Sequence, residues 1–188
     1  MKSLSSWNKR MYMDKVFYLL FFVIFLIIAR LIPHPPNFSP IIASAIFAPI
    51  LLKNRYYGFI VPLSALFISD VIIGFHIYQL VIYLTLFTIS LISPLKKYSK
   101  INLILYSIGA SIWFFIITNF AVWLAWDYYP KNFEGLMQCY TLAIPFFTNT
   151  LISSILFISL FIIFKVWIEK LNAKTNNYLT NNFFTSKN

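Results

Sequence analysis

The sequence is short of the residues on which most enzymes depend. Its 188 residues include only 5 acidic residues, 2 histidines and one cysteine, Cys139. A lone cysteine can form neither an internal disulfide nor a zinc site of several cysteines. The chain also lacks a phosphate-binding loop, a zinc-protease His-Glu-x-x-His motif and a Gly-x-Ser-x-Gly elbow. We therefore expect a protein that is not an enzyme and that holds no cofactor or metal.

Charged residues make up only 11% of the chain, whereas 60% of it is hydrophobic and 20% is aromatic. A typical soluble domain is about 25% charged. This composition predicts an integral membrane protein whose first partner is the lipid bilayer. The net charge of +10 does not indicate a nucleic-acid partner, because the basic residues flank apolar segments, as they do at the ends of membrane-spanning helices.

The apolar residues form separate segments that predict an all-α integral membrane fold with six transmembrane helices. A helix needs about 20 residues to cross a bilayer, and the second segment is short. The segments are 16–33, 40–52, 57–75, 77–95, 101–126 and 143–168. Residues 1–15 are expected to be a cytoplasmic N-terminal segment, 16–168 the membrane domain and 169–188 a cytoplasmic polar tail. From Leu171 on, this tail is expected to be poorly ordered. Pro145 is expected in the first turn of the last helix.

The distribution of basic residues predicts that both ends of the chain are cytoplasmic. Cytoplasmic loops of membrane proteins carry an excess of Lys and Arg. With six spans and a cytoplasmic N-terminus, all of the 15 basic residues except Arg30 and Lys131 fall on the cytoplasmic side. A second segment that failed to span would reverse every later loop and turn Lys96, Lys97 and Lys100 outward.

Polar residues collect near the outer ends of the predicted helices. The first outer loop, 30–40, contains four prolines and is therefore stiff. An outward pocket with a few polar groups among aromatic side chains is typical of small-molecule sites. The residues predicted to bind a solute there are His34, Asn37, Asp70, His76, Asn119, Trp123 and Asn149. The alternative is that these groups only join helices by hydrogen bonds.

Two further contacts are predicted within the membrane domain. Asp70 near the outer end of the third segment needs a partner, because a carboxylate inside the bilayer is costly. Arg30 is the first candidate, in a structural ion pair that is also compatible with a pocket wall. Ser44 and Ala48 are spaced so that another helix can approach closely, either within the chain or in a partner protein.

Several of these stretches together resemble an uncharacterised family of bacterial multi-pass membrane proteins of the DUF6580 type. The stretches are Arg30–Pro40, Val61–Leu63, Ser69–Asp70, Gly74–His76, Thr118–Phe120 with Trp123, Cys139–Tyr140, Pro145–Phe147 and Asn149–Leu151. That family is distantly similar to the substrate-binding S components of energy-coupling factor transporters. The resemblance implies a six-helix subunit in the bacterial inner membrane that takes up a vitamin-like solute and works with a separate energy-coupling module. It also implies that Ser44 and Ala48 contact that module. Ser153 and Ser154 stand where the family carries Gly-Asp.

The leading hypothesis is therefore uptake of a vitamin-like small molecule. A membrane scaffold or assembly subunit without transport is the alternative, in which the polar motifs are structural. A third hypothesis is an intramembrane enzyme that uses His34 or His76 with Asp70. Metal binding by these three residues matches no known ligand spacing.

Overall fold

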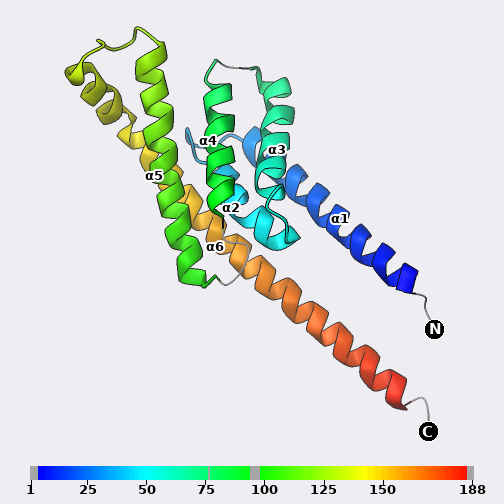
Figure 1. The fold of residues 1–188 in the computed structure, drawn as a ribbon. Helices are drawn as coiled ribbons and strands as arrows, with labels where there is room; N and C mark the ends of the chain where they lie inside the picture. Colours follow the sequence, from blue (N-terminus) through cyan, green and yellow to red (C-terminus); the bar gives the residue numbers. More distant parts are fainter. Residues whose placement is uncertain (1–3, 76, 94–97, 186–188) are drawn as a thin grey trace.

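The computed structural model describes the backbone of residues 4–75, 77–93 and 98–185, and the side chains of 16–75, 77–93 and 98–170. This part of the chain is all-α, with helices and no strands (Figure 1). The helices are α1 (Leu4–Leu31), α2 (Ile41–Leu52), α3 (Tyr57–Ile73), α4 (Gln79–Ile92), α5 (Lys100–Ala125) and α6 (Phe133–Thr185). Five of them begin or end within a few residues of the predicted apolar segments.

The short helix α2 is the centre of the bundle. It packs against all of the other helices, and nearly all of its side chains are buried. Ser44 and Ala48 are fully buried within the chain, where their small size lets neighbouring helices approach closely. They therefore form the internal contact that the sequence left open. The predicted contact of these two residues with a partner protein is not compatible with this arrangement, because neither side chain is exposed.

A proline and a glycine fix the packing of α2 against α3. Pro49 lies inside α2 and has no N–H to donate to the carbonyl of Ala45. Gly58 of α3 lies against this site, since a Cβ on Gly58 would stand 2.5 Å from Pro49 Cγ and 2.8 Å from the Ala45 oxygen. The absence of a side chain at Gly58 thus allows α3 to approach the backbone of α2.

Helix α6 is longer than the sequence predicts at both ends. It begins at Phe133, where the side-chain oxygen of Asn132 accepts a 2.8 Å hydrogen bond from the N–H of Gly135. This is the geometry of a helix N-cap. Pro145 is therefore inside the helix and not in its first turn, so that prediction is wrong. The backbone remains helical to Thr185, through the segment expected to be poorly ordered. Helix α1 likewise starts at Leu4, within the segment assigned to the N-terminal extension.

Two helical segments of the described chain are long and apolar enough to cross a membrane, Lys100–Ala125 and Phe133–Lys170. The other apolar stretches are shorter, at 10–17 residues, and a helix rises only 1.5 Å per residue. They are Val16–Leu31, Ile41–Leu52, Tyr57–Ile73 and Gln79–Ile92. Length and composition thus single out α5 and α6, and six membrane crossings remain a prediction.

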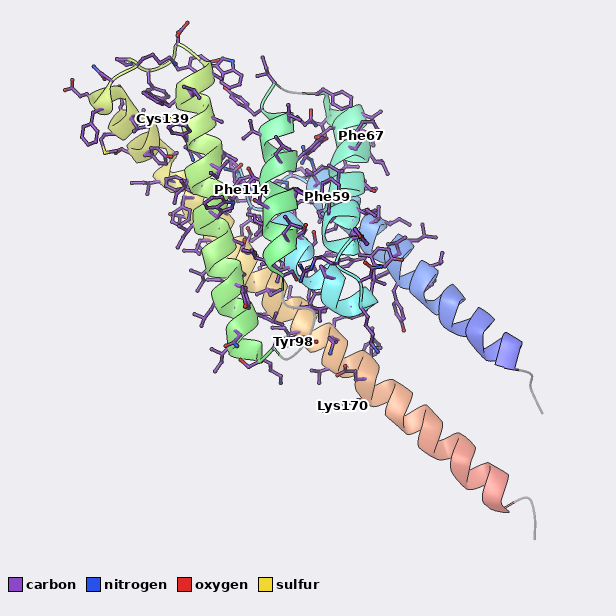
Figure 2. All side chains as sticks on the ribbon, in the orientation of Figure 1. Phe59, Phe67, Tyr98, Phe114, Cys139 and Lys170 are labelled. Atoms are coloured by element: carbon purple, nitrogen blue, oxygen red, sulfur yellow. The ribbon has the colours of Figure 1, made fainter. Side chains whose placement is uncertain are left out.

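The connections between helices gather at two ends of the bundle. The loop between α3 and α4 lies at the same end as the loop between α5 and α6, at the top of Figure 1. The ring of Tyr78, from the first of these loops, lies 4.2 Å from the ring of Trp126 in the second. The N-terminal part of α1 and the C-terminal part of α6 extend away from this end (Figure 1). Figure 2 shows Cys139 near the upper end, and Tyr98 and Lys170 toward the opposite end.

Candidate functional site

A cavity of about 260 Å³ lies where the α1–α2 loop meets the interior of the bundle. All six helices contribute to its lining, which indicates that it is a feature of the whole fold. Its polar lining residues are Arg30, His34, Asn37, Ser39 and Thr150. Its apolar lining residues are Ile41, Ile42, Leu66, Ile73, Ile82 and Phe114.

A second cavity, also of about 260 Å³, adjoins the first. The two share the lining residues Asn37, Ile82, Phe114 and Thr150. Figure 2 shows Phe114 on the side of α5 that faces α4. The second cavity is more aromatic, and it is also lined by Tyr78, Val81, Phe115, Thr118, Asn119, Val122, Phe146 and Phe147. Ligand pockets typically measure about 300–1,000 Å³, so the two compartments together reach that range.

The proline-rich loop presents its polar side chains to these cavities by a tight turn. The N–H of Phe38 donates to the carbonyl of Pro35 at 3.0 Å, and Asn37 has a positive φ of 62°. A type II turn takes Pro at its second position and a residue with positive φ at its third, where Asn is tolerated. The sequence Pro35-Pro36-Asn37-Phe38 meets both conditions, and the turn brings Asn37 to the boundary of the two compartments.

Behind the first cavity, Asp70 is the centre of a polar cluster that joins three helices. Its carboxylate accepts hydrogen bonds from Arg30 of α1 and from Gln79 of α4. The hydroxyl of Tyr83 on α4 donates a third, at 3.1 Å. Asp70 itself is only 1% exposed. The predicted ion pair with Arg30 is thus present, and it supports the cavity wall from behind, because Arg30 lines the cavity and Asp70 does not.

At the same end of the bundle, the α5–α6 loop is held by Lys131. Its ammonium group donates to the carbonyls of Trp123 and Trp126 at the end of α5. These carbonyls belong to the last turn of a helix, which favours a nearby positive charge. The indole N–H of Trp123 donates to the carbonyl of Pro130 at 2.9 Å, so Trp123 closes this loop.

The sequence match to a known family covers most of the chain. Residues 11–175 match a family of unknown function, DUF6580. The chain belongs to this family. No curated protein and no solved structure matches the chain. The predicted relation of this DUF6580 member to S components is not supported by any of these comparisons.

The two adjoining cavities together form a cleft in this DUF6580 chain. This cleft contains part of the site that the sequence predicts. His34, Asn37 and Asn119 line it, whereas Asp70 lies behind it. Trp123 and Asn149 are not among the lining residues of either cavity. The amide of Asn149 instead donates to the carbonyl of Pro36 at 2.9 Å, which attaches the loop to α6. His76 lies outside the described residues. Among those that are described, no group of three His, Cys, Asp or Glu side chains is placed to hold a metal ion.

Sequence reasoning did not select Ser39, Thr118 and Thr150 as site residues, although all three line the cleft. Thr150 follows Asn149 directly, and successive helical residues point about 100° apart. A one-residue difference therefore decides which side chain faces the cleft and which faces the loop. Sequence reasoning also missed Gln79. Its side-chain amide stands at the start of an apolar segment, and such an amide needs a hydrogen-bond partner, so this position could have been identified.

Proposed function

We propose that this chain is a multi-pass protein of the bacterial inner membrane that binds a small molecule in the cleft formed by the two cavities. In this proposal it is a substrate-binding subunit for uptake of a vitamin-like solute, similar in its layout to S components. The observation that carries the proposal is that two adjoining cavities share Asn37, Ile82, Phe114 and Thr150. Together they provide an apolar site with a few polar groups, which is the usual design of a ligand pocket.

The surface of the bundle supports a location in the membrane. Large apolar side chains are exposed on α1 and on α3 to α6, among them Leu20, Ile72, Leu80, Leu105 and Leu160. Soluble monomers rarely expose large contiguous apolar patches. The interior, in contrast, contains many small polar residues, such as Ser107, Ser111 and Ser153. Small and polar residues between helices and apolar residues outside are what a bilayer favours.

The ends of the bundle differ in their charged residues in a way that supports cytoplasmic termini. Lys53 and Arg55 lie in the α2–α3 connection, and Lys165 lies 5.6 Å from the ring of Tyr98. These positions belong to the end opposite the cleft. Arg30 and Lys131 lie toward the cleft end and are both held by internal contacts. A cytoplasm-facing basic end would orient the cleft outward, as uptake requires.

The uptake hypothesis is tested by comparing the solutes that cells accumulate. Cells producing the chain and cells producing an Asn119→Leu variant would be grown in the same rich medium and extracted for untargeted mass spectrometry. Asn119→Leu keeps the approximate shape of the side chain but removes an amide that lines the cleft. Enrichment of a solute only with the unchanged protein supports uptake. Identical profiles at equal protein levels contradict it.

A membrane scaffold is the second candidate function, and one set of contacts favours it. Several polar groups already have partners on neighbouring helices: Trp113 donates to Thr88 at 2.9 Å, and Tyr140 donates to the Ile116 carbonyl at 2.6 Å. Hydrogen bonds of this kind stabilise helix contacts in membranes by about 1 kcal/mol each. A scaffold would need these contacts and no ligand, so detection of a bound molecule separates the two functions.

A further inference from the structure

Two polar atoms at the first cavity are buried without a hydrogen-bond partner. They are Nε of Arg30 and Oγ of Ser39, and both residues line that cavity. Buried polar groups in native proteins nearly always have a partner, so a group without one calls for an explanation. Both groups can donate a hydrogen bond, and the guanidinium has no acceptor function at all. The missing partner of this pair is therefore an acceptor.

The charges around the cavity favour an acceptor that carries a negative charge. The guanidinium of Arg30 lines the cavity, and none of its described lining residues is acidic. The nearest described carboxylate in this network, that of Asp70, is buried behind Arg30 and accepts from Arg30, Gln79 and Tyr83. Because Gln79 and Tyr83 also donate to Asp70, this carboxylate does not occupy every donor of Arg30, and Nε stays available to a second acceptor. An Arg N–H and a hydroxyl group in the wall of one cavity can both donate to a carboxylate, and the bond from the guanidinium is charge-assisted.

We infer that the cleft takes a small carboxylate with an apolar or aromatic body, and that the carboxylate lies against Arg30 and Ser39. This inference rests on the proposed function and names its substrate class. Because Ser39 Oγ is buried in this structure, the inference includes a rotation about the Cα–Cβ bond of Ser39 that turns the hydroxyl toward the cavity. The apolar body then extends past Ile82 and Phe114 into the aromatic second compartment, toward Phe115 and Phe147.

The test compares acids with their neutral amides on the full chain in lipid nanodiscs. The probes are 3-phenylpropionate and 3-cyclohexylpropionate, each beside its primary amide, and the dissociation constants are measured by isothermal titration calorimetry. Each acid is expected to bind about tenfold more tightly than its amide, because a hydrogen bond to a charged group is stronger than a neutral one.

Ser39→Ala is the decisive variant, since its hydroxyl has no internal partner to lose. We expect this variant to unfold at the same temperature as the unchanged protein and to bind the acids about tenfold more weakly. Ser159→Ala is the matched control, because that hydroxyl bonds only within its own helix, to Ile155 at 2.7 Å. It should leave the affinity unchanged.

Four results would overturn the inference. Amides that bind as tightly as the acids would show that the cleft does not select a carboxylate. An unchanged acid affinity in Ser39→Ala would show that the carboxylate does not lie against Ser39. A co-purified ligand without an acidic group would also overturn it, while leaving the proposed binding function intact. Absence of binding by all four probes overturns the inference as well, and the proposed function is then judged independently by the solutes that co-purify with the protein.

Discussion

The side-chain amide of Asn149 on α6 donates a 2.9 Å hydrogen bond to the carbonyl of Pro36 in the α1–α2 loop. The two residues are 113 positions apart in the chain. This bond attaches the proline-rich loop, which lines both cavities, to the longest helix. Asn149 is therefore a residue that positions the cleft and does not itself line it.

We predict that Asn149→Ala loosens the loop. Loss of one hydrogen bond should lower the free energy of unfolding by about 1 kcal/mol. The same substitution should also weaken ligand binding, because the loop that lines the cleft is then no longer attached to α6. Thermal unfolding and ligand titration on the same preparation measure both effects. Thr148→Ala is the control, since Thr148 bonds only to Ile144 of its own helix, at 3.1 Å. Equal effects of the two variants on binding would contradict the positioning role.

The ion pair of Arg30 and Asp70 gives a prediction about stability. Asp70→Leu leaves the partly buried guanidinium of Arg30 without its charge partner, which costs up to about 3 kcal/mol. A double variant, Arg30→Met with Asp70→Leu, removes both charges and should unfold at a higher temperature than Asp70→Leu alone. Thermal unfolding in detergent measures the difference. A double variant less stable than the single one would show that the pair is not the dominant interaction of this cluster.

The contact between Gly58 and Pro49 predicts opposite outcomes for two glycine substitutions. Gly58→Ala places a methyl group against a proline ring and a backbone oxygen, and overpacking of this kind costs about 1–3 kcal/mol. Gly109→Ala meets nothing within 4 Å and should stabilise α5 by up to about 1 kcal/mol through helix propensity. Thermal unfolding of both variants tests the packing of α2 against α3. If Gly58→Ala is the more stable of the two, that packing is wrong.

Two exposed tyrosines provide a test of orientation. Tyr56 is 76% exposed and Tyr128 is 69% exposed, and they lie in loops at opposite ends of the bundle. In a Cys139→Ala background, Tyr128→Cys should react with a membrane-impermeant maleimide on intact cells. Tyr56→Cys should react only after the cells are permeabilised, since the positive-inside rule places its loop in the cytoplasm. Labelling of both positions from outside would contradict six spans with cytoplasmic ends.

The positions of the helices were largely predictable from the sequence, because apolar runs and their polar breaks follow directly from residue type. The start of α6 was missed for a local reason: Pro145 was taken as a helix start, whereas Asn132 provides the cap thirteen residues earlier. The capping residue lies in a mixed polar segment without apolar periodicity. Nothing in the composition of that segment distinguishes a helix from a loop.

The site was predictable at the level of its region and less so at the level of its residues. A buried carboxylate requires a partner, so the Arg30–Asp70 pair followed from physical necessity. The roles of Asn149 and Thr150 depend on how α6 is rotated about its axis, which sequence spacing alone does not fix. The buried location of Ser44 and Ala48 depends on the central place of α2, which only the packing of all the helices decides.

Binding of a small molecule in the cleft is the central claim, and the quantity that tests it most directly is the amount of ligand that co-purifies with the protein. Mass spectrometry would be applied to the detergent-solubilised chain and to a Thr150→Phe variant, which fills the boundary between the two cavities. We predict one molecule per chain in the unchanged protein and loss of that molecule in a Thr150→Phe variant that remains folded. Stable protein without any bound molecule in several detergents would contradict the claim and favour the scaffold.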